Sequence, residues 1–147
     1  MIIDKLLSPA VSADLSDFTV STQVIGSGMD LGSVRNNGVY GNASNPGFVL
    51  TVRDATSGGS ATLNLLFVTD DNEALASTAT LWSTGAIALA SLDEYQLFVP
   101  MPVLDTYQQF IGWKATVGTA VFTGGTLSIE YVADFRQWRA YDAATGR

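Results

Sequence analysis

Two alternating segments in the C-terminal third of the chain constrain its fold more than any other feature. Residues 107–117 and 126–132 alternate aromatic or β-branched side chains with small or polar ones. This period of two is typical of β-strands that bury one face. The connection between them, residues 118–125, contains three glycines and no charged residue. The pattern predicts two long strands joined by an uncharged loop, which we expect to contact a surface rather than to transform a molecule.

Five other segments have the composition of shorter strands: residues 17–25, 47–53, 61–68, 78–83 and 94–99. Residues 54–59 predict a turn, residues 26–46 a long loop rich in Gly, Asn and Ser, and residues 71–76 a single helical turn. Seven or eight short strands without a long helix predict an all-β fold, a jelly roll or another β-sandwich. We expect one domain of about eight strands over residues 1–133.

Residues 134–147 differ from the rest and predict a C-terminal extension. Aromatic residues recur there every three positions, with arginines between them: Phe135, Arg136, Trp138, Arg139 and Tyr141. The segment is too short for a stable isolated helix and too aromatic for an ordinary disordered tail. We interpret it as a contact arm and these five residues as interface candidates. Packing of the aromatic side chains onto their own domain remains the alternative.

The charge pattern and the missing residue types exclude several functions. The formal net charge is −7, and the seven basic residues are scattered except for three near the C-terminus. Sustained contact with nucleic acid needs a clustered basic face, so we expect no nucleic-acid partner. No apolar run approaches the ~18–20 residues that span a bilayer, so we expect no membrane association. The chain has no histidine and no cysteine, which excludes Ser-His-Asp and Cys-His chemistry and also disulfides.

The acidic residues offer two candidate sites, each with a simpler explanation. The cluster Asp70-Asp71-Asn72-Glu73 could hold Ca²⁺, but it lacks the glycine and glutamate positions of an EF-hand. Asp and Asn also cap turns, and we favour that interpretation. A glycosidase pair could be drawn from Asp93, Glu94, Asp105 and Glu130, but Glu130 alternates with strand residues. We expect no enzyme and assign no catalytic, metal or cofactor residue.

The aromatic residues leave a carbohydrate-binding function open. Three tryptophans and five tyrosines could stack on sugar rings, with Trp82 and Trp138 as the residues to test. Most of the aromatic residues are interleaved with strand residues, so core packing is the simpler interpretation of Trp113 and Tyr131. A carbohydrate-binding jelly roll is therefore the alternative function.

Several segments, in their order and spacing, resemble one protein family. They are residues 1–5, 21–32, 61–71, 81–89, 100–102 and 107–132, the last including Val117-Gly118 and Phe122-Thr-Gly-Gly125. This set resembles the jelly-roll capsid cement (decoration) proteins of tailed bacteriophages, a family first associated with a short-tailed Bordetella phage. The 26–46 loop and the 134–147 extension are longer than the family pattern.

The resemblance implies a structural protein of the virion. Such a protein would be made in the host cytoplasm and would sit on the outer surface of an HK97-type capsid. There it would bridge neighbouring capsomers and stabilise the shell, without catalysis or a cofactor. The implied partners are the major capsid protein and further copies of the chain, as a homo-oligomer in which a dimer is favoured over a trimer.

Overall fold

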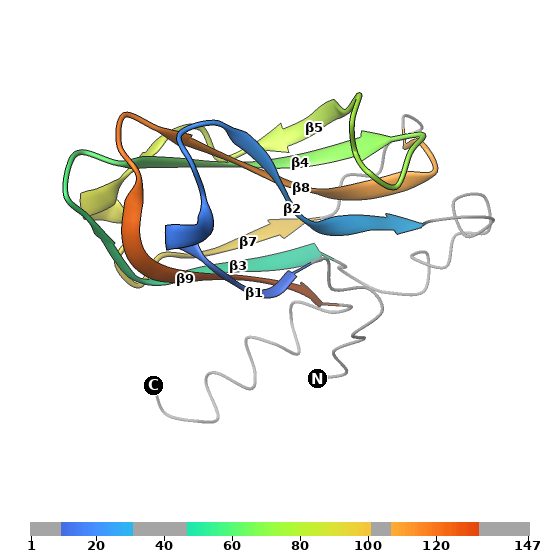
Figure 1. The fold of residues 1–147 in the computed structure, drawn as a ribbon. Coiled ribbons are helices and arrows are strands. Elements are labelled where there is room, and N and C mark those ends of the chain that lie inside the picture. Colours follow the sequence, from blue (N-terminus) through green and yellow to red (C-terminus); the bar gives the residue numbers. More distant parts are fainter. Residues whose placement is uncertain (1–9, 31–46, 101–106, 133–147) are drawn as a thin grey trace, which may run out of the picture.

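The computed structural model of the 147-residue chain describes residues 10–30, 47–100 and 107–132. These residues form nine β-strands and two short 3-10 helices (Figure 1). The elements are β1 (Ala10–Asp14), η2 (Leu15–Asp17), β2 (Thr22–Asp30), β3 (Gly47–Ser57), β4 (Thr62–Asp70), β5 (Ala79–Ser83), β6 (Ile87–Ala88), η4 (Leu89–Ser91), β7 (Gln96–Pro100), β8 (Phe110–Gly118) and β9 (Phe122–Val132).

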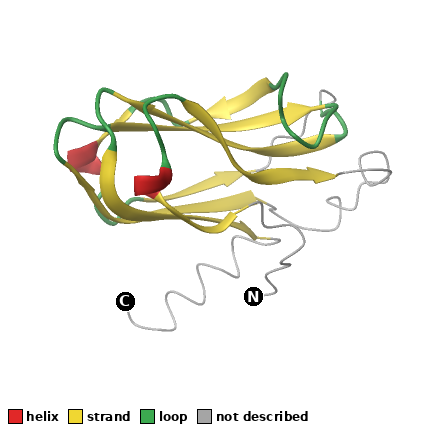
Figure 2. Cartoon of the chain, viewed as in Figure 1, coloured by secondary structure: helices red, strands yellow, loops and turns green. Residues whose placement is uncertain are grey.

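The strands form two antiparallel sheets that pack face to face as a sandwich, as Figure 2 shows. Sheet 1 has the order β1-β9-β3-β7, and sheet 2 has the order β2-β8-β4-β5, with the short β6 also paired to β4. The pairing is nested: β1 pairs with β9, β2 with β8, β3 with β7, and β4 with β5. A long antiparallel hairpin wrapped in this way is a jelly roll. The predicted fold class is therefore confirmed.

The core lies between the sheets and contains a cluster of aromatic side chains. The rings of Phe48, Phe67 and Trp113 lie with centroids 5.1–5.4 Å apart, which joins β3 of sheet 1 to β4 and β8 of sheet 2. Tyr131 packs against Phe48, and Trp82 packs edge-on against Trp113. Since each large aromatic side chain buries 150–250 Å², this cluster supplies much of the apolar contact between the sheets.

Several predicted boundaries were wrong. The segment 17–25 is not the first strand, because β1 precedes it, η2 occupies its start and its strand begins at Thr22. That strand, β2, continues to Asp30, so residues 26–30 of the predicted loop 26–46 are strand, and residues 31–46 lie outside the described residues. The expected turn 54–59 is mostly strand, since β3 runs on to Ser57 through an irregular pairing with β9. β9 likewise begins at Phe122, so the uncharged loop contains only residues 119–121.

The expected helical turn at 71–76 was also wrong. The chain there makes turns and bends, and Leu75 has a positive φ of 52°, which interrupts any helical path. The reason is tertiary: the buried Leu75 side chain packs against Gly112 on β8, so this loop is fixed by sheet 2 rather than by local helix formation.

Candidate interaction surfaces

The outer face of sheet 1 changes from charged to apolar along its strands. Directly paired residues share a face, so the register places Asp14, Thr126 and Arg53 in one row across three strands. The next row contains Thr51 between Ser128 and Gln96. Val49 follows between Glu130 and Phe98, and Val49 is only 2% exposed although it points away from the core. In this last row Val49 is thus covered and Glu130 and Phe98 are half-buried, whereas Asp14, Thr126 and Arg53 at the other end of the face are exposed.

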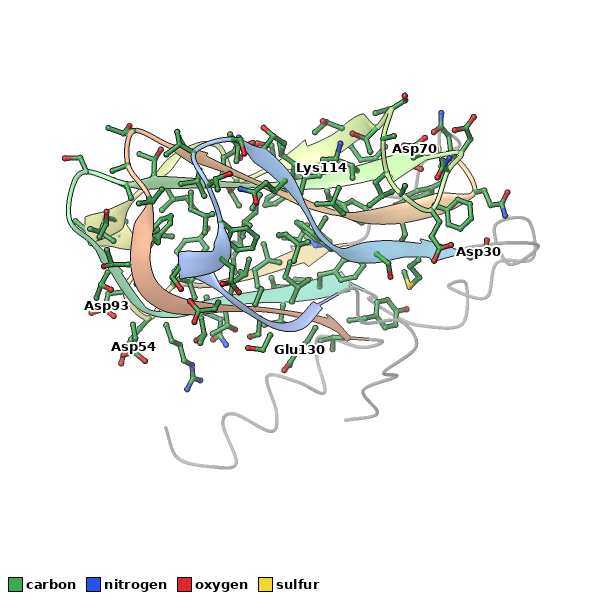
Figure 3. The ribbon with its side chains drawn as sticks, in the orientation of Figure 1. Asp30, Asp54, Asp70, Asp93, Lys114 and Glu130 are labelled. Carbon is green, nitrogen blue, oxygen red and sulfur yellow. The ribbon has the colours of Figure 1, made fainter. Side chains whose placement is uncertain are left out.

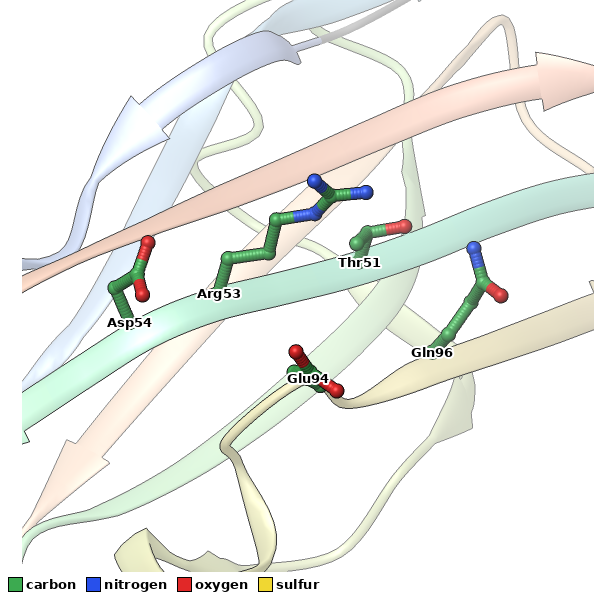
Figure 4. Close-up of a pocket in the computed structure, with 5 residues that line it drawn as sticks. All are labelled: Thr51, Arg53, Asp54, Glu94 and Gln96. Atoms are coloured by element: carbon green, nitrogen blue, oxygen red, sulfur yellow. The ribbon is translucent and has the colours of Figure 1, made fainter. Parts of the chain in front are cut away.

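A polar pocket of about 420 Å³ occupies the open end of this face, as Figure 4 shows. The described residues that line it are Thr51, Arg53 and Asp54 from β3, Gln96 at the start of β7, and Glu94 just before it. The pairing of Thr51 with Gln96 brings these two distant segments together. Within the part of the chain that the structure describes, Arg53, Asp54 and Glu94 make no ion pair with one another or with any other residue.

The backbone is strained at both acidic residues of this pocket. Asp54 has a φ of 53° and Glu94 a φ of 52°, so both are in the left-handed region. Asp tolerates this region better than most residues, but Glu has no side-chain feature that favours it. Two of the four described non-glycine residues with positive φ therefore line one pocket.

The loop between β4 and β5 covers the part of the outer face of sheet 2 around Gly28 and Gly112. The backbone N–H of Gly28 on β2 donates a 3.1 Å hydrogen bond to the carbonyl of Glu73. A Cβ at Gly28 would lie 2.7 Å from that carbonyl oxygen, and a Cβ at Gly112 would collide with Leu75. The two glycines thus provide the space in which the loop lies against the sheet.

Asp70 holds the start of this loop through backbone hydrogen bonds. One carboxylate oxygen accepts from the N–H of Asp71 at 2.8 Å, and the other accepts from the N–H of Ser77 at 2.8 Å. Burial alone would raise the pKa of Asp70, but the hydrogen bonds from Ser77, Asp71 and Asn72 outweigh it and lower the pKa. These contacts confirm the predicted turn role of the Asp70–Glu73 cluster. No group of three or more metal-binding side chains occurs among the residues described.

Three further titratable groups have shifted pKa values, each with a local cause. The pKa of Asp14 is lowered because its carboxylate accepts hydrogen bonds from the hydroxyl and the N–H of Ser16. Burial raises the pKa of Tyr95 and of Tyr131. None of these shifts marks a site of proton transfer, because each follows from capping or from core packing.

The end of the sandwich at the β8–β9 turn carries the two exposed large apolar side chains found in the described ranges. Val20 is 51% exposed and Val121 is 48% exposed. They flank one end of the β2–β8 pair, where the N–H of Val117 donates to the carbonyl of Ser21. Scattered exposed apolar residues are common, so this end is a weaker candidate surface than the pocket.

The residues singled out from the sequence are separated in the structure. Asp54 and Asp93 lie toward one end of the sandwich and Asp70 toward the other, and Glu130 lies on the outer face of sheet 1 (Figure 3). Glu94 alone lines the polar pocket. Trp82 is half-buried against Trp113. Asp105 and the five contact-arm candidates, Phe135, Arg136, Trp138, Arg139 and Tyr141, lie outside the described residues.

Sequence reasoning missed the pocket although part of its signal was present. The alternation of residues 47–53 places Thr51 and Arg53 on the side away from the core. Their partners Glu94 and Gln96 come from a segment about 40 residues later, and only the β3–β7 register joins the two. Strand pairing of this kind is not visible in a single sequence.

Comparison with known proteins places the chain in a family. Residues 8–131 match the model of the Bbp16 family. A comparison with curated proteins found no match. No helix within the described ranges has the length and apolar character needed to cross a membrane. Since the family match begins before β1 and ends within β9, it spans most of the chain and nearly the whole jelly roll. The protein therefore belongs to the Bbp16 family.

Proposed function

We propose that this protein is a capsid cement protein, which binds the outside of a phage capsid and stabilises the shell by bridging neighbouring capsomers. The observation that carries the proposal is the Bbp16 family match over residues 8–131, which coincides with the jelly-roll body. The sequence segments named above also support it, because their order and spacing along the chain resemble those of phage cement proteins. The site of action is the outer surface of the virion, and the partner is the major capsid protein.

The physical properties of the body suit a passive mechanical role. A sandwich with a continuous aromatic core between two sheets deforms little under load, because packed interiors have low compressibility. Many weak contacts repeated around an icosahedral shell would give strong overall attachment through avidity. The role requires neither catalysis nor a cofactor.

The charge of the body favours a protein partner over nucleic acid. The described residues include ten carboxylates and only two basic side chains, Arg53 and Lys114, a formal charge of −8. Phosphate backbones would be repelled by such a body. A partner surface with exposed lysine and arginine would be attracted, at a rate that falls as salt rises.

Co-purification with particles tests the proposal. Intact particles are purified through a density gradient, and the ratio of this chain to the major capsid protein is measured by quantitative mass spectrometry. We expect about one copy of this chain for every few copies of the major capsid protein. Particles that lack the chain should release their DNA at a lower temperature than particles that carry it. Particles that lack the chain, or that are equally stable without it, would refute a cement role.

The contact arm is tested separately by truncation. Removing residues 134–147 is expected to preserve cooperative unfolding of the jelly roll but to weaken its attachment to particles. If the truncated chain instead melts far below the full chain, the aromatic residues of the arm belong to the core of their own domain. Light scattering on the same samples measures mass, for which we expect a dimer.

A further inference from the structure

We propose that the polar pocket on the outer face of sheet 1 binds one lysine or arginine side chain of the shell protein. The pocket is the one defined by Thr51, Arg53, Asp54, Glu94 and Gln96. This inference rests on the proposed function and identifies the face of the jelly roll that meets the capsid. It concerns described residues only and does not involve the contact arm.

The charge balance of the pocket determines the sign of the ligand. The described residues that line it include two carboxylates, Asp54 and Glu94, and one guanidinium, Arg53, an excess of one negative charge. One incoming cation would give two positive and two negative groups, so that each carboxylate can face a positive group. An acidic ligand would instead add to this excess and would also meet the other described residues, whose formal charge is −7 (eight carboxylates against Lys114).

The charged groups of the pocket are available for such a ligand. Figure 4 shows the guanidinium of Arg53 extended away from the carboxylate of Glu94. Thr51 and Gln96 lie on the same face and are joined through the β3–β7 register, so their hydroxyl and amide oxygens can accept further hydrogen bonds from the cation. Lys114, the other described basic residue, is on β8 of sheet 2 and donates to the Thr78 hydroxyl at 3.0 Å, so it does not neutralise the pocket.

Asp54 and Glu94, which both line the pocket, have left-handed backbone conformations. Residues in this region are destabilising unless the surrounding structure enforces them, and such strain concentrates at functional sites. A glycine would adopt the same φ without strain, yet both positions carry a carboxylate beside the same pocket.

The other faces of the molecule compete poorly as cation sites. On the outer face of sheet 2, the chain's own loop covers the region around Gly28 and Gly112, and the Lys114 ammonium lies on β8 of the same sheet. The end that carries Val20 and Val121 has no carboxylate on the 119–121 turn. Both carboxylate oxygens of Asp70 already accept hydrogen bonds from backbone N–H groups, so this residue is a poor partner for a cation.

The test compares charge-neutralising variants inside and outside the pocket. Glu94→Gln and Asp54→Asn remove one carboxylate charge each with little change of shape. Asp93→Asn and Asp17→Asn remove the same charge from exposed positions that do not line the pocket. Purified chain is added back to particles stripped of it, and the free concentration that gives half occupancy is measured at several salt concentrations.

We expect each pocket variant to raise the half-occupancy concentration about tenfold, since a hydrogen bond to a charged group contributes roughly 1.5–3 kcal/mol and 1.4 kcal/mol is tenfold. The controls should change it less than twofold. The salt dependence of the pocket variants should also be shallower than that of the controls. Pocket and control variants that behave alike would overturn the proposal, whereas a wild-type chain that does not bind stripped particles would refute the cement function itself.

Two further variants separate binding from stability and identify the source of the cation. Glu94→Gly should weaken attachment as much as Glu94→Gln while leaving the melting temperature equal or higher. A lower melting temperature would mean that Glu94 has a structural role and would count against the proposal. The double variant Arg136→Gln/Arg139→Gln should add to the effect of Glu94→Gln. If Glu94→Gln instead has no effect on the half-occupancy concentration of a chain that already carries the double variant, the cation comes from the chain's own arm. The assignment to the shell protein is then wrong.

Discussion

The buried carboxylate of Asp70 fixes the start of the loop between β4 and β5 through hydrogen bonds from backbone N–H groups. It is 1% exposed and accepts backbone hydrogen bonds on both oxygens. Those bonds fix the direction in which the chain leaves β4 and thereby place Leu75 against Gly112. The turn could be predicted from residue types alone, because Asp and Asn bond neighbouring backbone N–H groups in most settings.

Replacing Asp70 with Asn is expected to lower the melting temperature in a pH-dependent way. The folded-state pKa of Asp70 is below its ordinary value, so its contribution to stability is fully present above about pH 3.8 and is lost as pH falls through the lowered value. The difference between wild type and Asp70→Asn should therefore be large at pH 7 and should shrink below pH 3.8. Thermal unfolding followed by circular dichroism from pH 7 to pH 2 measures it. A difference that does not change over this range would contradict the hydrogen-bonding account.

Gly28→Ala tests the close approach of the β4–β5 loop to β2. The new methyl group would meet a backbone carbonyl at 2.7 Å, and backbone cannot rotate away as a flexible side chain can. Overpacking of this kind costs roughly 1–3 kcal/mol in the free energy of unfolding. Gly58→Ala is the matched control, because nothing lies within 4 Å of its Cβ position. Urea denaturation of both variants should show a large loss for the first and little change for the second.

At the scale of single elements, the turn between β8 and β9 contains the most unusual backbone. Thr119 is β-branched and has a φ of 70°, a combination that is rare because its side chain crowds the backbone. Thr119→Gly should raise the free energy of unfolding by up to about 1 kcal/mol. Glycine relieves the strain of the left-handed conformation, which costs a non-glycine residue roughly 1–2 kcal/mol, but the greater conformational freedom of glycine in the unfolded chain offsets part of this gain. Thr126→Gly, in the ordinary strand backbone of β9, should lower it. Equal losses in both variants would show that the turn is not strained.

The strands that could be predicted are those with a strong apolar alternation. β4, β5, β7 and β8 were expected within a few residues of their observed bounds, because their inward positions are large apolar residues. β1 was missed because Ala10–Asp14 contains little apolar bulk. The end of β3 was mistaken for a turn because Asp54–Ser57 has turn composition, yet its pairing with β9 keeps it extended. Tertiary pairing overrides local propensity in both cases.

At the scale of the whole molecule, the two sheets depend on a few aromatic side chains that cross between them. Phe48 of sheet 1 contacts Phe67 and Trp113 of sheet 2 and is 1% exposed. Phe48→Ala should lower the free energy of unfolding by roughly 3–5 kcal/mol, because the cavity cannot collapse between two rigid sheets. Trp113 fluorescence and circular dichroism should report one shared transition. Separate transitions for the two probes would show that the sheets do not unfold as one unit.

The pocket also belongs to this scale, which is why no single segment predicts it. Glu94 was considered as a possible catalytic carboxylate, and Arg53 as a solvent-facing strand residue, with nothing in the sequence to relate them. The jelly-roll order brings β3 next to β7 and so makes one surface from two distant segments. The fold could thus be inferred from local patterns and the family resemblance, whereas the candidate site requires the strand register.

The central proposal is that this jelly roll stabilises a phage shell from the outer surface of the capsid. A cryo-electron microscopy map of intact particles tests that claim most directly. We expect density for a two-sheet sandwich on the outer surface between neighbouring capsomers, with the outer face of sheet 1 toward the shell and Asp54 and Glu94 beside a basic side chain. A particle surface without this density, or with the sandwich inside the shell, would contradict the account.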